Sequence, residues 1–346
     1  MTTFIQLHLL TAYPPANLNR DDLGRPKTAI VGGTERLRVS SQSLKRAWRT
    51  SEHFESALAD FKGTRTKRLG EEVFKRLLEK GVAEKKAKKW ASEIAGVFGK
   101  VKNDNPLEIE QLAHVSPEEW QAVLSLADTL AEEDREPEKE DLDLLRHNPK
   151  AVDIALFGRM LASSPAFNVE AAAQVAHAIT VNPVKIEDDF FTAVDDLNTH
   201  EEDAGAGHMG DAGFGSGVFY QYICINRDLL VENLQGDENL ANQAIAALTE
   251  AAAKVAPTGK QNSFASRAYT SYLLAEKGAQ QPRTLSVAFL KPVRDTNDPL
   301  ATAIKQLQDQ RDKFDKVYGD CADDRRELNA EKGEGSLQAI IDFVSQ

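Results

Sequence analysis

A long, charged, helix-like stretch separates two β-rich parts of this chain, and that order constrains the fold more than any other feature. Alternating apolar residues predict strands at 5–9 and 36–40. From about residue 60 to 170 the pattern is helical and charged, broken by one glycine and four prolines, Gly81, Pro106, Pro117, Pro137 and Pro149. The β pattern returns in three segments, 218–226, 268–276 and 284–290. We therefore predict an α-helical insertion within an α+β sheet.

The predicted elements outside this insertion are close to a ferredoxin-like arrangement. The strand at 5–9 alternates and is predicted to be half-buried and to end at Pro14–Pro15, and residues 16–34 lack periodicity and are predicted to form a loop. Helices are predicted at 41–58, 238–255 and 298–317. Without the insertion, the order β–β–α–β–α–β–β–α predicts a sheet with helices on one face.

The composition is that of a protein in a reducing, aqueous compartment. A hydrophobic content of 41% supports a core, and 28% charged residues is typical of soluble proteins. No run approaches the ~18 apolar residues of a membrane span, and MTTFIQLHLL has no basic n-region. Cys224 and Cys321 form no CxxC pair. We expect a cytoplasmic protein without a membrane segment.

The first 50 residues form a basic island in an acidic chain. The net charge is −12, yet this segment has three acidic and eight basic residues, Arg20, Arg25, Lys27, Arg36, Arg38, Lys45, Arg46 and Arg49. A helix capped by Ser41 or Ser43 is predicted to begin within the island, and the free N–H groups at a helix start attract phosphate. Basic groups on loop, strand and helix together predict binding to a nucleic-acid backbone, whereas a solvated basic face is the alternative.

The predicted insertion consists of a basic block followed by an acidic block. Residues 61–102 carry thirteen basic and five acidic side chains, whereas residues 103–150 carry four basic and fourteen acidic ones. This distribution predicts a strongly polarised molecule.

Other motifs are interpreted as structural, and no catalytic, metal or cofactor site is predicted. GAGHMG at 205–210 matches G-x-G-x-x-G but precedes a strand, so it is predicted to be a hairpin tip. Acidic and histidine residues over 187–211 lack the spacing of a metal site. His177 is predicted to lie in the core. Phe190, Phe191 and Met209 would either wedge between stacked bases, dock on a neighbouring molecule, or pack the hairpin onto the body.

Ordered sequence blocks closely resemble the CasC family, the backbone subunits of Cascade, the type I-E CRISPR surveillance complex. The blocks are F-I-x-x-H at 4–8, LNRDD at 18–22, GG at 32–33, R-x-R at 36–38, SSQSLKRA at 40–47, VDIALFGRM at 152–160, AHAIT at 176–180, FTAVDDL at 191–197 and SGVFY at 216–220. They cover the N-terminal lobe and the centre, and the insertion and C-terminal third match weakly.

The resemblance implies a hand-like α+β protein. A palm of the RNA-recognition type, related to the ferredoxin-like arrangement, would comprise 1–58, 173–181 and 215–346. Helical fingers would occupy 59–172, and a thumb β-hairpin 182–214. Copies would polymerise as a helical filament on the CRISPR guide RNA (crRNA), present it to target DNA in antiviral defence, and contact the large, small and two guide-end Cascade subunits.

The family's functional residues can be carried onto matching positions. Contacts to the guide backbone would fall to Arg20, Lys27, Ser40, Gln42, Lys45, Arg46 and Arg49. Met160, Thr192 and Met209 would flank a displaced nucleotide. Phe190, Phe191 and His208 would contact the thumb or a neighbour. The basic run 85–89 is suggested for target DNA.

Two alternatives remain at the sequence level. Backbone subunits of related type III effectors cut RNA with a loop aspartate, and Asp21 or Asp22 lies in a comparable loop, so a metal-dependent ribonuclease is the main rival. The type I-E blocks favour an Arg20–Asp link or a loop brace instead. A free-standing RNA-binding protein is the third possibility.

Overall fold

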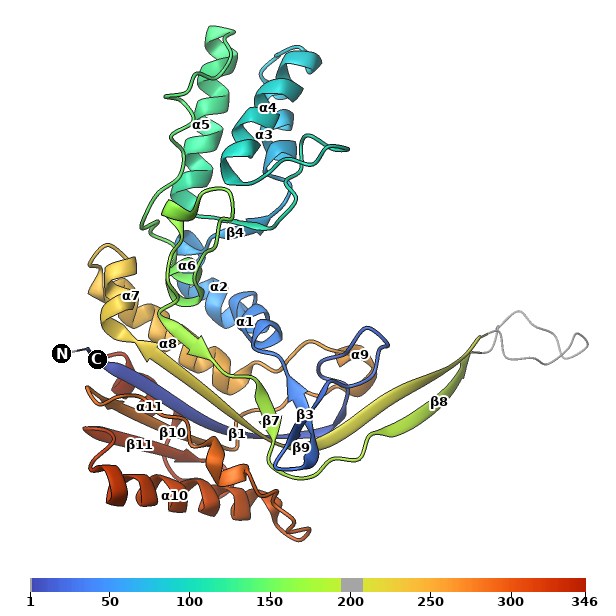
Figure 1. Cartoon of the computed structure of the whole chain (residues 1–346), viewed down its shortest axis with the longest axis vertical. Coiled ribbons are helices and arrows are strands. Elements are labelled where there is room, and N and C mark those ends of the chain that lie inside the picture. Colours follow the sequence, from blue (N-terminus) through green and yellow to red (C-terminus); the bar gives the residue numbers. More distant parts are fainter. Residues whose placement is uncertain (1, 194–207) are drawn as a thin grey trace, which may run out of the picture.

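The computed structural model describes residues 2–193 and 208–346, and no side chain is described between 193 and 209. Residues 205–207 of GAGHMG and the middle of the predicted thumb therefore lie outside the described residues. Within them, nine strands form one sheet whose paired strands are antiparallel (Figure 1). The main order is β11-β10-β1-β9-β7-β3-β2, and β6 and β8 also pair with β9.

The strands of this sheet come from the whole chain. Their bounds are β1 Phe4–Ala16, β2 Thr28–Val31, β3 Thr34–Val39, β6 Ala173–Val175, β7 Ala178–Thr180, β8 Glu187–Ala193, β9 His208–Asn226, β10 Tyr272–Gly278 and β11 Asp324–Asn329. The mixed α/β class with a large sheet is as predicted. Four strands of the sheet were not predicted, namely β2 within the expected loop, the short β6 and β7, and the polar β11.

Strand β1 lies inside the sheet, with a paired strand on each side. It pairs with β9 on one side and β10 on the other, with Leu7 opposite both Ile223 and Ala275. Both of its faces are buried from Ile5 to Leu10, so the predicted half-burial is wrong. The strand also continues through Pro14–Pro15, where its pairing with β9 shifts, because a bulge accommodates proline in a sheet.

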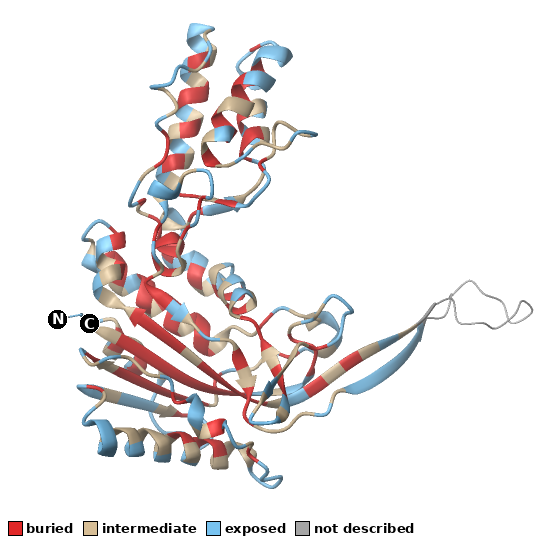
Figure 2. Cartoon of the chain, in the orientation of Figure 1, coloured by how far each residue is buried: buried red, intermediate tan, exposed pale blue. Residues whose placement is uncertain are grey.

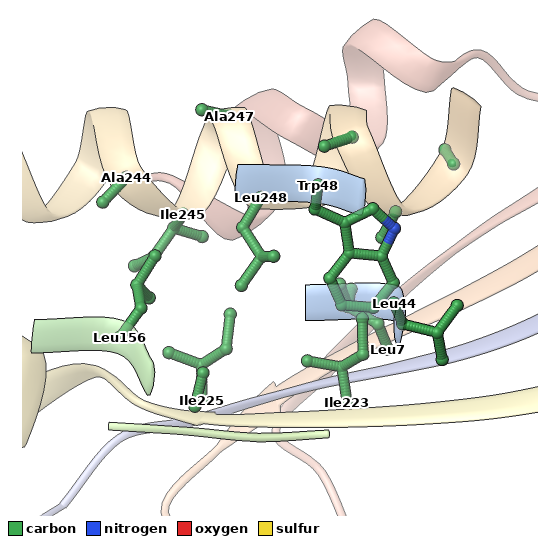
Figure 3. Packing of buried hydrophobic residues seen from close by; sticks show 14 of the residues in the cluster. Leu7, Leu44, Trp48, Leu156, Ile223, Ile225, Ala244, Ile245, Ala247 and Leu248 are labelled. Carbon is green, nitrogen blue, oxygen red and sulfur yellow. The ribbon is translucent and has the colours of Figure 1, made fainter. Parts of the chain in front are cut away.

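One face of the sheet carries the main hydrophobic core. Helices α1 (Ser41–Arg49), α2 (Glu52–Leu58), α6 (Val152–Phe157), α7 (Arg227–Asn233), α8 (Glu238–Lys254) and α11 (Leu337–Val344) contribute to it. Figure 3 shows Trp48 and Leu44 of α1 packed with Ile223 and Leu7 of the sheet and Leu248 of α8. The predicted helix at 41–58 is two helices, because Ser51 caps a new one.

The opposite face is covered as well, so the prediction of helices on one face is wrong. Helix α10 (Pro299–Tyr318) and the 3₁₀ helix η3 (Ser286–Phe289) pack there, and their Leu307 and Phe289 share a hydrophobic cluster with Tyr220 and Tyr272. The predicted strand at 284–290 is also wrong, because residues 286–289 form this 3₁₀ helix. A buried ion-pair network also lies beneath α10, where Glu276 of β10 bonds His8, Arg283 and Arg325.

The predicted insertion has its own hydrophobic core. Its elements, named here the helical arm, are β4 (Thr64–Thr66), α3 (Leu69–Glu79), α4 (Glu84–Phe98), β5 (Ala113–Val115) and α5 (Pro117–Glu133). Trp90, Ile94 and Leu130 lie in this second core. Ser116 begins α5 with a capping box, in which Glu119 bonds back to the Ser116 N–H, and Pro117 takes the first helical position. Figure 2 shows the buried inner faces of these helices.

Besides the helical arm, a hairpin formed by β8 and the start of β9 projects from the sheet. Strand β8 pairs with the first residues of β9, from Glu187↔Phe214 to Ala193↔His208, and this protruding hairpin extends away from the body (Figure 1). Three short helical segments complete the described fold, namely η1 (Ala59–Phe61), η2 (Pro165–Phe167) and α9 (Gln261–Phe264).

Candidate nucleic-acid interface

The start of α1 is fixed to the loop that precedes β2. Ser40, not Ser41 or Ser43, caps α1, because its hydroxyl oxygen accepts the Ser43 N–H at 3.3 Å. The Ser40 N–H donates to the Asn19 side-chain oxygen at 2.9 Å. Ser40 is itself buried, so its hydroxyl helps to position the helix start.

The same loop is tied to the base of the protruding hairpin. The Asn17 amide donates to the Gly24 carbonyl at 3.0 Å and to the Gly213 carbonyl of β9 at 2.9 Å. Arg25 forms an ion pair with Asp188 of β8 at 3.0 Å. Loop, helix start and hairpin base therefore form one connected surface.

Asp21 braces this loop from within. One of its carboxylate oxygens accepts the Leu23 N–H at 3.0 Å and the Arg25 N–H at 2.9 Å. This is an Asx-type turn, in which an aspartate side chain stands in for a backbone acceptor. The carboxylate thus has a structural use, whereas Asp22 is exposed.

Five of the predicted RNA-binding side chains lie on the loop and the first turns of α1. Arg20, Gln42 and Arg46 are exposed, and Lys27 and Lys45 are half-buried. The Lys45 ammonium lies 5.5 Å from the centre of the Phe157 ring, and burial lowers its pKa. An open polar groove of about 470 Å³ is lined by Leu18, Asn19, Arg20, Asp21, Asp22, Gly24, Ser43, Thr258 and Gly259.

Arg49 differs from these residues because its charge is used inside the molecule. Its guanidinium bonds the wholly buried carboxylate of Asp153 at 3.0 Å. The same carboxylate accepts bonds from His114 at 2.8 Å and from the Gly63 N–H at 2.8 Å. Arg49 therefore connects α1 to the helical arm, and we do not place it on the RNA surface.

The two arginines of R-x-R have different surroundings. Arg36 is completely buried and donates to the carbonyls of Thr180 at 2.8 Å and Phe289 at 3.2 Å. Arg38 is half-buried and its guanidinium contacts His177 Nδ1 at 2.9 Å. The prediction that His177 lies in the core is wrong, because its ring is half-buried beside this arginine.

The residues expected to flank a displaced nucleotide lie on separate elements. Met160 follows α6, is 78% exposed, and lines a 290 Å³ pocket with Phe98, Gly99, Lys100, Glu110, Gln111, Leu112, Leu161, Ala162 and Ser163. Thr192 of β8 is exposed and lies opposite Met209 of β9. Phe190 is 63% exposed, and Phe191 packs over Gly210. The side chains of His208 and Met209 lie outside the described part.

Comparison with known proteins gives consistent matches over nearly the whole chain. The model of the CT1975-like protein family matches residues 5–341. The chain belongs to this family. It is also similar to a chain described as part of a "CRISPR RNA-guided surveillance complex, pre-nicking", with 31% identity, a TM-score of 0.85 and 99% of both chains covered.

A second solved chain supports the same relationship. This one, described as part of a "CRISPR RNA-guided surveillance complex", has 26% identity, a TM-score of 0.76 and 99% coverage of both chains. Comparison with curated proteins gives no match. The resemblance to Cascade backbone subunits that the sequence blocks indicated is confirmed.

The two charge blocks of this CT1975-like chain neutralise each other in the helical arm. The ion pairs between them are Arg76–Asp128, Lys80–Asp128, Lys86–Asp134, Lys89–Glu136, Lys100–Glu110 and Lys102–Glu108. The prediction of a strongly polarised molecule is therefore wrong for this part. Within residues 2–193 and 208–346, five basic side chains of the block 61–102 form no ion pair, namely Arg65, Lys67, Lys75, Lys85 and Lys88.

Two further observations concern what the described part of the chain lacks. No three His, Cys, Asp or Glu side chains come together there as a metal site. No described helix is both long and apolar enough to cross a bilayer.

Proposed function

We propose that this chain is a non-catalytic backbone subunit of a cytoplasmic CRISPR RNA-guided surveillance complex. It binds the phosphate backbone of the guide RNA and presents the RNA for pairing with target DNA. The observation that carries the proposal is the joined surface of loop and helix start, where Arg20, Gln42 and Arg46 are exposed beside Lys27 and Lys45. These groups contact phosphate, which holds no sequence information, so base pairing reads the target.

In this proposal the sheet body is the palm, the helical arm the fingers, and the protruding hairpin the thumb. The hairpin leaves the body with Phe190 exposed and its base fixed by the Arg25–Asp188 pair. Such a projection suits a head-to-tail contact with the next copy, and heterologous contacts that do not close produce open filaments. The other Cascade subunits bind the ends and flank of that filament.

The decisive experiment is co-expression of the full chain with a guide-RNA array and its sibling subunits. We expect a high-molecular-weight assembly that contains several copies of the chain and one short RNA of uniform length. Nuclease treatment should leave the bound RNA protected. A chain that stays monomeric on a sizing column with guide RNA present would contradict assembly and favour a free-standing RNA-binding protein.

The ribonuclease alternative is tested on the same assembly. Because the Asp21 carboxylate accepts two backbone N–H groups within its own loop, it is better suited to bracing the loop than to holding a metal. We expect complementary RNA to remain intact with Mg²⁺. Regularly spaced cuts that disappear in Asp21→Ala or Asp22→Ala would establish the rival function.

The arm lysines provide a prediction for target DNA. Lys85 and Lys88 of α4 are exposed and form no ion pair in the described part, whereas Lys86 and Lys89 are paired with Asp134 and Glu136. We expect Lys85→Gln with Lys88→Gln to weaken DNA binding by the guide-loaded complex. Loss of two phosphate contacts on a single strand would reduce the salt slope of log K by about 1.4.

The matched control is Lys86→Gln with Lys89→Gln, which changes the net charge by the same amount on the same helix. Its effect should be smaller, because each of those ammonium groups already has a carboxylate partner. DNA binding is measured by titration at several salt concentrations. Equal losses in the two double variants would mean that only the overall charge of the arm matters.

A further inference from the structure

Two cationic side chains and an imidazole meet where β3 pairs with β7, next to the edge strand β2. Arg38 lies opposite Ile179, and His177 comes directly before β7. The Arg38 guanidinium contacts His177 Nδ1 at 2.9 Å, and the Arg38 backbone N–H donates to the Lys27 carbonyl at 2.8 Å. Lys27 also lines a small pocket with Arg38 and Asn19.

The hydrogen bond fixes the state of the imidazole. A guanidinium has donors only, so Nδ1 of His177 must be an acceptor and the ring proton must be on Nε2. Burial, followed by the positive charges of Arg38 and Lys27, lowers the pKa of His177. The ring is therefore neutral at pH 7 and has a free N–H to offer beside two cations.

The charges of Arg38 and Lys27 have no internal counterion. Across the described residues, neither Arg38 nor Lys27 has a carboxylate within ion-pair distance, although Arg25 and Arg49 close by in the sequence are both paired. Two cations close enough to lower the pKa of a shared neighbour repel each other. An anion bound between them would remove that repulsion, and it would gain charge-assisted hydrogen bonds.

We propose that Arg38, His177 and Lys27 form a phosphate-binding site for the RNA backbone where β3 pairs with β7. Arg38 and Lys27 supply the charge, and His177 holds the Arg38 guanidinium in place and donates its Nε2–H. This inference rests on the proposed function and deepens it, because it adds Arg38 and His177 to the RNA surface. It also extends that surface from the loop and α1 onto the sheet.

The site is tested by titrating a short single-stranded oligouridine RNA with the full chain at several salt concentrations. We expect Arg38→Gln to weaken binding about tenfold and to reduce the salt slope by about 0.7, as for one lost phosphate contact. His177→Leu should weaken binding severalfold. His177→Gln should restore it, because an amide can accept from Arg38 and donate as well.

The control is Arg326→Gln, the same change at an exposed arginine on β11, at the opposite edge of the sheet, which should bind like wild type. If Arg38→Gln fails to fold, the comparison of His177→Leu with His177→Gln decides instead. An unchanged affinity and slope in Arg38→Gln would overturn the site, as would an unrestored His177→Gln. Wild-type protein that binds no RNA would instead refute the proposed function.

Discussion

Replacement of Lys45 and Arg46 by glutamine is expected to weaken guide-RNA binding by about 10- to 100-fold. Both side chains lie on the first turns of α1, where Arg46 is exposed and Lys45 is half-buried. A hydrogen bond to a charged group contributes about 1.5–3 kcal/mol and one between neutral groups about 0.5–1.5 kcal/mol, so each exchange for glutamine costs about 1 kcal/mol. A difference of about 1.4 kcal/mol corresponds to a factor of ten. Glutamine is preferable to alanine, because it keeps a polar side chain where the Lys45 ammonium lies over the Phe157 ring.

The loss should be nearly the same for guides of different sequence. Phosphate contacts position a nucleic acid but do not read its bases. Removal of two such contacts should also flatten the dependence of log K on log salt by about 1.4. The measurement is a set of RNA titrations between low and physiological salt, with at least two unrelated spacer sequences.

The control for this double variant is Lys316→Gln with Arg326→Gln. These exposed cations lie on α10 and β11, so the net charge changes equally at the other side of the molecule. We expect near-wild-type RNA affinity for this protein. A loss confined to particular spacers, or an equal loss in the control, would refute backbone binding by α1.

The parts of the fold that were predictable are those whose burial repeats along the sequence. The helices near 238–255 and 298–317 were predicted to within one residue, the first from its alanine-rich composition and the second from its amphipathic pattern. The edge strands β2 and β11 have no such signal. In β11 most side chains of DRRELN are exposed or half-buried, and the strand is held by backbone bonds to β10.

The prediction of a strongly polarised molecule failed because the sequence does not show which helices pack together. The basic and acidic blocks are separate in sequence, yet Arg76 and Asp128 lie 2.7 Å apart because α3 packs on α5. Whether a lysine is free for a ligand therefore depends on helix packing, which a count along the chain does not contain.

The candidate interface was predictable only where it is local. Arg20, Gln42 and Arg46 lie within one loop and one helix start, so their clustering follows from the sequence. Arg38 and His177 are 139 residues apart and meet only through β3–β7 pairing. Conversely, Arg49 shares the local pattern but is withdrawn from the surface by a buried aspartate on a distant helix.

That aspartate is the basis of the second large effect. Asp153 of α6 joins the sheet body to the helical arm, because it accepts from Arg49 of α1, from His114 of β5 and from Gly63 just before β4. Burial opposes its ionisation, but the bonds from His114, Gly63 and Arg49 hold the pKa of Asp153 below its ordinary value. It is therefore charged at neutral pH.

Asp153→Ala should reduce the free energy of unfolding by about 3–5 kcal/mol, because it leaves the Arg49 charge partly buried without its partner. Urea unfolding followed by tryptophan fluorescence measures this. In a Trp48→Phe background, the remaining Trp90 and Trp120 report on the arm alone. The control Asp128→Ala removes a partly exposed ion pair in the arm and should cost at most about 1 kcal/mol.

The milder Asp153→Asn links this junction to function. Asparagine has one acceptor oxygen in place of two, so it can keep either the Gly63 bond or the bonds from Arg49 and His114 but not all three. The charge that holds Arg49 is gone. Because Lys85 and Lys88 lie on the arm and Lys45 and Arg46 on the body, the junction sets how the two proposed binding surfaces are placed relative to each other. We expect guide-RNA affinity to be retained and DNA binding by the guide-loaded complex to fall. If both change together, or if Asp153→Ala costs no more than Asp128→Ala, Asp153 does not fix the arm to the body.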